Sequence, residues 1–144
     1  MREILFRAKK KNWSELPKEE WWVEGYPVKY QPCASKDEWT YGIVPTYASA
    51  LYIIETDPET LCQYTGKTDE EGKKIFENDI VGFIDLYSTE SGYSESSCLG
   101  EVIWSKEECC FHVTNRLSAE SWEVLDECKV VGNVFDDKEL LEEF

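Results

Sequence analysis

The chain has 144 residues, of which 42% are hydrophobic and 14% aromatic, so it can bury one core and is not a disordered chain. Thirty acidic residues against fifteen basic ones give a net charge of −15, which favours solubility and repels polyanions. The charge is uneven, because residues 1–18 hold six basic residues against two acidic ones. No apolar segment follows Met1, so the sequence predicts an intracellular protein with neither a signal peptide nor a membrane-spanning helix.

The N-terminal part, residues 1–59, is predicted to consist of β segments joined by loops. The expected strands cover residues 2–8, 21–30, 41–45 and 47–55, and the last two are either separate strands or one bent strand. Gly25 and Pro27 interrupt the second of these strands, and such a break indicates a bulge or an edge strand.

Aromatic residues in the second strand are the clearest sign of an interaction surface. Trp21 and Trp22 must point to opposite faces of a strand, so one ring is either exposed or covered by a partner. Tyr26 follows on the same irregular segment. We therefore predict a partner or self-association surface at Trp21, Trp22 and Tyr26, since edge strands invite pairing.

The basic run of residues 9–11 is interpreted as a solvated loop rather than a nucleic-acid contact. It offers about three phosphate contacts, whereas useful binders make about 6–10. We therefore expect no useful binding to duplex DNA at physiological salt.

The central stretch, residues 63–81, holds two turns around a short strand. Residues 69–72 combine an acidic start, whose side chain can bond its own backbone, with a glycine that can take a positive φ. Residues 73–76 resume an extended chain. Residues 77–79 turn again before an apolar strand begins at Ile80.

The C-terminal part is predicted to be a compact β core. Residues 79–87 are apolar on both faces, which indicates a strand covered on both sides. Residues 88–97 are interpreted as a polar loop, residues 100–104 and 109–114 as a hairpin, and residues 128–135 as the last strand. This order is similar to that of small SH3-like barrels. We predict a mainly β fold and a single domain over residues 1–144, with the N-terminal β part packed on an SH3-like barrel core at 60–136 and a short helix at 137–144.

Two sets of side chains could carry chemistry. His112, the single histidine, lies near Cys109, Cys110 and Cys128, which are residue types that bind zinc. Adjacent strand residues point to opposite faces and Cys109–Cys110 is not a zinc spacing, so we expect free thiols and no metal or other cofactor. Cys110 and His112 share a face but stand about 6–7 Å apart, too far for a direct nucleophile–base hydrogen bond. We therefore expect no catalytic residue and no enzymatic activity.

The central stretch resembles the signature of the YopX family, small proteins carried by phages and prophages of Gram-positive bacteria. Similar segments occur in the family's order at residues 2–7, 22–26, 57–60 and 130–135. Lys67 and Asn78 depart from the family pattern, which has an apolar residue and a glycine there. Residues of the family motif are expected to be structural: Gln63, Tyr64, Thr65, Gly66, Asp69, Gly72, Asp79, Gly132 and Asn133.

The resemblance implies a phage or prophage accessory protein in the cytosol of a bacterial host, and it assigns no activity. We expect a non-enzymatic protein that binds a protein partner from the host, from the phage or from a second copy of itself as a homo-oligomer. The alternative is a nucleic-acid-related role, either as an acidic mimic of DNA or as a weak binder through the N-terminal basic patch.

Overall fold

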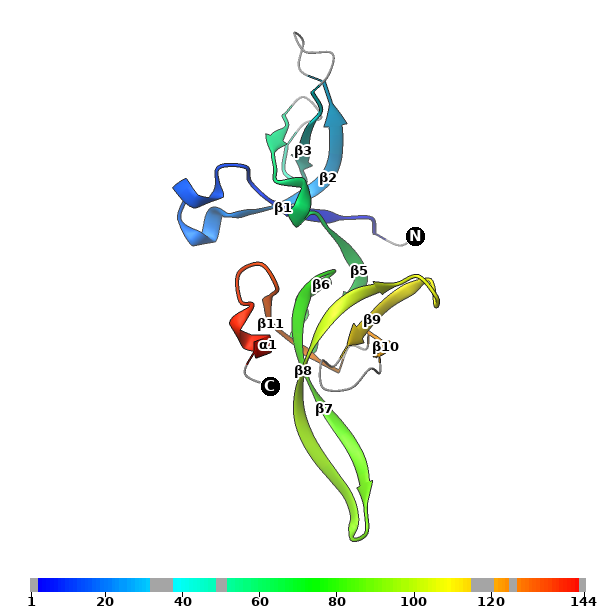
Figure 1. The fold of residues 1–144 in the computed structure, drawn as a ribbon. Helices are drawn as coiled ribbons and strands as arrows, with labels where there is room; N and C mark the ends of the chain where they lie inside the picture. Colours follow the sequence, from blue (N-terminus) through cyan, green and yellow to red (C-terminus); the bar gives the residue numbers. More distant parts are fainter. Residues whose placement is uncertain (1–2, 32–37, 49–51, 115–120, 125–126, 143–144) are drawn as a thin grey trace. The chain divides into compact units, whose positions relative to one another are not determined.

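A computed structural model describes residues 3–31, 38–48, 52–114, 121–124 and 127–142 (Figure 1). The fold is mainly β, as predicted, with two antiparallel sheets and one short α-helix. The chain divides into two compact units, Met1–Tyr64 and Thr65–Phe144. Strand β5 (Cys62–Thr68) crosses the boundary, which lies just beyond the expected end of the N-terminal part at residue 59.

The first unit is built on an antiparallel sheet in the order β4–β3–β2–β1–β5. Its other strands are β1 (Phe6–Lys9), β2 (Trp22–Tyr30), β3 (Thr40–Pro45) and β4 (Ile54–Glu55), and its 3₁₀ helices are Trp13–Glu15, Lys18–Glu20 and Pro58–Thr60. The core forms where Ala8, Val23 and Ile43 meet. The prediction of a bulge at Gly25 is wrong, because β2 pairs with β3 in unbroken register, but beyond Gly25 the strand has β3 as its paired strand and no register with β1, as the alternative of an edge expected. Pairing with β1 ends at Gly25, so Pro27 lies beyond it.

The second unit contains a five-stranded antiparallel sheet in the order β10–β9–β8–β7–β11. These strands are β7 (Asp79–Thr89), β8 (Gly92–Ser105), β9 (Cys110–Thr114), β10 (Ser121–Glu123) and β11 (Lys129–Asn133). Strand β6 (Lys74–Phe76) pairs with β5, and helix α1 covers Glu139–Glu142. The core cluster is made of Ile75, Val81, Val102, Val113, Val124, Cys128 and Val130.

Strands β7 and β8 form a long hairpin, drawn in green to yellow-green in Figure 1. Their pairing continues to Thr89 and Gly92 at the tip, so the predicted loop at residues 88–97 is wrong. Backbone hydrogen bonds hold a ribbon together whatever its side chains are, and Gly92, with φ at 124°, supplies the conformation of the turn.

The predicted SH3-like barrel is not confirmed, because neither sheet closes on itself within the described residues. Backbone groups at the outer edge of β11 form hydrogen bonds with aspartate side chains and with a turn, and not with another strand. The Val130 N–H donates to Asp69 Oδ2 at 3.0 Å, the Cys128 carbonyl accepts from the Glu70 N–H at 3.0 Å, and the Asn133 N–H donates to Asp137 Oδ2 at 3.1 Å. These bonds satisfy an edge that barrel closure would otherwise have paired.

The two central turns form as the sequence predicted. Gly72 has φ at 82°, and Asn78 takes the left-handed region at 70°, which asparagine tolerates. No atom lies within 4 Å of a Cβ placed on Gly72, so a side chain there has room but a strained backbone.

We therefore expect Gly72→Val to lower the free energy of unfolding by about 1–2 kcal/mol, the cost of a left-handed L-residue. Thr68→Ala, an exposed change in the same connection, is expected to cost less than about 0.5 kcal/mol. Urea unfolding of the two variants tests this. Equal, negligible losses would contradict the assignment of a strained turn.

Candidate functional site

The histidine and the cysteines that could carry chemistry differ in their exposure. His112 is buried in β9, and the cysteines of the described residues, Cys62, Cys98, Cys109, Cys110 and Cys128, are free thiols. Cys33 lies outside the described residues. Within the part of the chain that the structure describes, no group of three His, Cys, Asp or Glu side chains is placed to hold a metal ion.

Trp13 and the two tryptophans of the predicted interaction surface surround a lysine. Lys9 Nζ lies 4.0 Å from the ring centroid of Trp13, 4.7 Å from that of Trp21 and 5.8 Å from that of Trp22. The lysine is only 4% exposed. Ammonium groups are attracted to the faces of indole rings, and the attraction grows when water is excluded. This cation–π cluster therefore uses ring faces that a partner would otherwise contact.

Further contacts distinguish the two tryptophans of the predicted surface from its tyrosine. The Arg7 guanidinium lies 4.8 Å from the Trp22 centroid, and Trp21 Nε1–H donates to the Leu16 carbonyl at 2.9 Å. Tyr26 is 52% exposed and lies on the same side of β2 as Trp22. The structure thus joins Trp21 and Trp22 through Lys9, and leaves Tyr26 as the exposed ring of the three.

The basic patch at residues 9–11 is reduced by these contacts. Lys9 lies in the cation–π cluster, and Lys11 Nζ lies 3.4 Å from a Glu55 carboxylate oxygen. Counterion release by cationic side chains drives non-specific DNA binding, so few charges remain here to drive it.

We expect the chain to bind duplex DNA with a dissociation constant weaker than about 0.1 mM in about 0.15 M salt. Lys10→Ala with Lys11→Ala should leave this weak binding unchanged. Fluorescence anisotropy with a labelled duplex measures both. Micromolar binding that weakens steeply with salt and is lost in the double variant would contradict the prediction.

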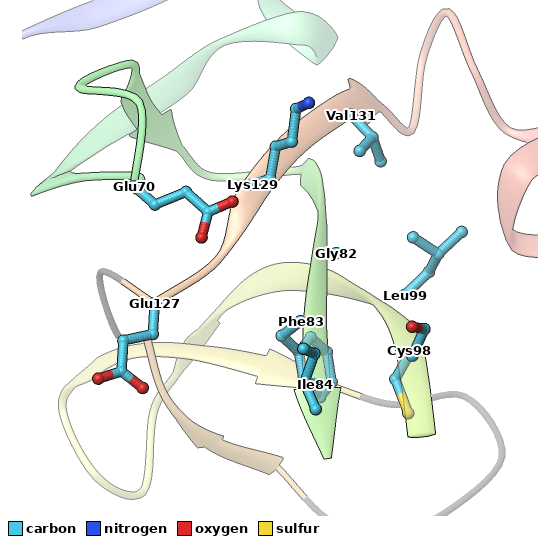
Figure 2. Close-up of a pocket in the computed structure, with 10 residues that line it drawn as sticks. Glu70, Gly82, Phe83, Ile84, Cys98, Leu99, Glu127, Lys129 and Val131 are labelled. Atoms are coloured by element: carbon cyan, nitrogen blue, oxygen red, sulfur yellow. The ribbon is translucent and has the colours of Figure 1, made fainter. Parts of the chain in front are cut away.

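A groove of about 600 Å³ crosses three neighbouring strands of the second unit, and we call it the β7 groove. Gly82 at its centre is paired with Leu99 of β8 and with Lys129 of β11. Its apolar lining comes from Phe83, Ile84, Leu99 and Val131, and its rim includes Glu70, Glu127 and Lys129. Figure 2 shows the side chains of Leu99 and Val131 pointing toward the space beside Gly82.

The missing side chain of Gly82 gives the groove its depth. A Cβ built on Gly82 would lie 3.6 Å from Leu99 Cδ2 and 3.9 Å from Val131 Cγ1, which are ordinary contact distances. The register of β11 shifts between Val130 and Gly132, so Val131 is the extra residue of a bulge. Bulges redirect side chains, and Val131 is 43% exposed beside the groove.

Part of the apolar lining is open to solvent. Ile84 is 61% exposed, so the predicted burial of this strand on both faces is wrong at that position. Phe83 packs against the core cluster while also lining the groove. The β7 groove is therefore anchored to a rigid core on one side and is accessible on the other.

Residues of the family motif hold the rim in place. The buried Asp69 carboxylate accepts hydrogen bonds from the backbone N–H groups of Glu71, Lys73 and Val130 at 2.9, 2.9 and 3.0 Å. Burial raises the pKa of Asp69, but these bonds and the charge of Lys73 outweigh burial and bring the pKa below its usual 3.8. The ionised carboxylate thereby ties the turn bearing Glu70 to β11.

A signal for the groove exists in the sequence but is weak by itself. A glycine inside an apolar strand marks either a bulge or a site where another group approaches closely, and Gly82 is such a glycine. To decide between a bulge and a close approach, one needs the register of β7 against two other strands, and the sequence pattern does not contain it.

By its fold, the chain is a small, mainly antiparallel β protein with a groove on the second of its two units. None of the helices in the described ranges has the length and apolar character needed to cross a membrane. The family model described as "YopX protein" matches residues 6–142, and the chain belongs to the YopX family. A search of curated proteins found no match.

Proposed function

We propose that this YopX family member is a phage or prophage accessory protein that binds a protein partner through the β7 groove in the bacterial cytosol, without catalysing a reaction. The observation that carries the proposal is the open apolar lining, with Ile84 61% and Val131 43% exposed beside a depression at Gly82. Contiguous apolar surface rimmed by polar residues is typical of interaction sites.

The composition of the groove favours a protein ligand. Its apolar centre and charged rim follow the arrangement of protein interfaces, in which a dry centre is surrounded by polar residues. A few buried contacts near such a centre supply most of the binding energy. The depression at Gly82 can receive one apolar side chain, and Ile84 and Val131 can pack beside it.

We expect Ile84→Ser and Gly82→Val to reduce capture of the partner at least about 10-fold, because truncating a central contact costs about 2 kcal/mol or more and filling the depression excludes the ligand. The measurement is a pull-down from nuclease-treated host lysate with tagged chain, quantified for each captured protein. Tyr47→Ser is the matched control, since Tyr47 is 75% exposed on the first unit. Capture that is unchanged in both groove variants would refute the proposal.

A second candidate is mimicry of nucleic acid, and the distribution of charge favours it. The first unit holds eight basic and ten acidic residues, whereas the second holds seven basic and twenty acidic ones. A mimic would capture a DNA-binding protein that duplex DNA competes away, and Gly82→Val would leave the capture intact. The groove proposal expects the opposite result for both measurements.

Self-association is the third form of partner binding. Light scattering of the wild-type chain and of Tyr26→Ser distinguishes a complex built on the predicted Trp21, Trp22 and Tyr26 surface from one built on the β7 groove. A groove-mediated oligomer would dissociate in Ile84→Ser and persist in Tyr26→Ser.

A further inference from the structure

We propose that the β7 groove takes a segment whose apolar side chains are flanked by lysine or arginine, with the apolar groups seated beside Gly82 and the basic ones on Glu70 and Glu127. This inference rests on the proposed function and adds the chemistry of the partner. It follows from the charge at the rim, the charge of the unit that bears the groove, and the blocked edge of β11.

The rim presents negative charge to a ligand. Lys129 Nζ lies 3.3 Å from a Glu71 carboxylate oxygen, so the basic residue of the rim is already paired. Glu70 and Glu127 are exposed, and neither forms an ion pair with another residue of the described ranges. A basic side chain arriving at the rim therefore meets carboxylates that no cation of the described residues already occupies.

The surrounding unit strengthens the same preference. Its twenty acidic and seven basic residues give a net charge of −13, against −2 for the first unit. Charged surfaces steer oppositely charged ligands and exclude like-charged ones. A second copy of this unit would bring the same −13 to the groove, which disfavours a groove-to-groove dimer and favours a basic partner.

The partner must bind by its side chains. Strand addition needs unpaired backbone groups at a sheet edge, but the Val130 N–H and the Cys128 carbonyl beside the groove already bond Asp69 and Glu70. Apolar side chains can enter the depression at Gly82 without any such bond. The affinity then depends on residue types in the ligand, which makes the inference testable with short peptides.

The test uses the full chain and fluorescein-labelled peptides in fluorescence anisotropy. The probe is Lys-Lys-Leu-Ser-Leu-Ser-Leu-Lys-Lys, and its controls replace every Lys by Glu or every Leu by Ser. We expect the probe to bind at least about 10-fold more tightly than either control in about 0.05 M salt, and this advantage over the glutamate peptide to shrink in about 0.5 M salt, where the Debye length is short.

Variants identify the site on the protein. Glu70→Lys with Glu127→Lys should weaken probe binding about 10-fold and strengthen binding of the glutamate peptide. Glu19→Lys, an exposed change of the same kind on the first unit, is the control and should have little effect.

Two results would overturn the inference: equal binding of the lysine and glutamate peptides, or equal binding of the leucine and serine peptides. A small apolar molecule found in native mass spectra of the wild type but absent from Ile84→Ser would do the same. These results leave the lysate pull-down untouched. The proposed function fails separately, when Ile84→Ser and Gly82→Val capture the same proteins as the wild type.

Discussion

Replacing Asp69 with alanine is expected to lower the free energy of unfolding by about 3–5 kcal/mol. Three backbone N–H groups, from Glu71, Lys73 and Val130, lose their acceptor together, and each bond to a charged group contributes about 1.5–3 kcal/mol. The three losses overlap because one side chain makes all the bonds, so their sum is an upper bound. Urea unfolding followed by circular dichroism gives the value.

Asp57→Ala is the matched control. The Asp57 side chain also accepts from a backbone N–H, that of Glu59 at 3.0 Å, but it makes this single exposed bond at the start of a 3₁₀ helix. A lost N-terminal cap costs about 1 kcal/mol. Equal losses in the two variants would show that Asp69 is an ordinary turn residue and does not connect the turn to β11.

The lowered pKa of Asp69 also predicts a dependence on pH. A carboxyl whose pKa is lower in the folded state than in the unfolded state stabilises the fold fully above the unfolded value, which is 3.8. That contribution is lost as the pH falls below 3.8 and through the folded pKa. We expect Asp69→Asn to flatten the acid limb of the stability curve there, while leaving stability at pH 5–8 lower but equally flat. An unchanged acid limb would contradict the pKa direction.

The turns of the second unit could be predicted because their causes are local. Gly72 and Asn78 take positive φ in the structure, and the residue types that tolerate this conformation are few. The hairpin of β8 and β9 was likewise predicted, since two extended runs flank a short polar turn. Each of these features depends on residues that are close together along the chain.

The groove and the cation–π cluster could not be predicted in this way. The groove needs Leu99, Gly82 and Lys129 in one row, and this row is set by strand pairings between distant parts of the sequence. The sequence predicts that Lys9 belongs to a solvated basic loop, and this prediction is wrong for Lys9, which is buried. The pairing of β1 with β2 places it opposite Trp22, and the indole rings then supply a partner that the local sequence does not show.

The long hairpin shows the limit of composition as a guide. Residues 88–97 contain serine, glycine and glutamate, which are typical of loops, yet they are paired as strands up to Thr89 and Gly92. Polar side chains do not oppose a two-stranded ribbon, because its hydrogen bonds join backbone groups. Alternating apolar residues predict strands that pack on a core, whereas this part of the hairpin is held together by backbone hydrogen bonds.

Gly25→Ala is expected to lower the free energy of unfolding by about 3 kcal/mol or more, at the upper end of overpacking effects. A Cβ on Gly25 would overlap the Val44 carbonyl oxygen and would lie 2.7 Å from Ile43 Cγ2. Neither neighbour can yield easily. The Val44 carbonyl oxygen belongs to the backbone of the adjacent strand β3, and the Ile43 side chain is fully buried in the core of the first unit.

Gly82→Ala is the control that separates lack of space from a general intolerance of glycine replacement in strands. The added Cβ would lie 3.6 Å or more from every neighbour, so its stability is expected to stay within about 0.5 kcal/mol of the wild type. Thermal and urea unfolding of the two variants measure the difference. Similar stabilities would mean that β2 and β3 can separate at Gly25, and a large loss in Gly82→Ala would mean that the β7 groove is closed in solution.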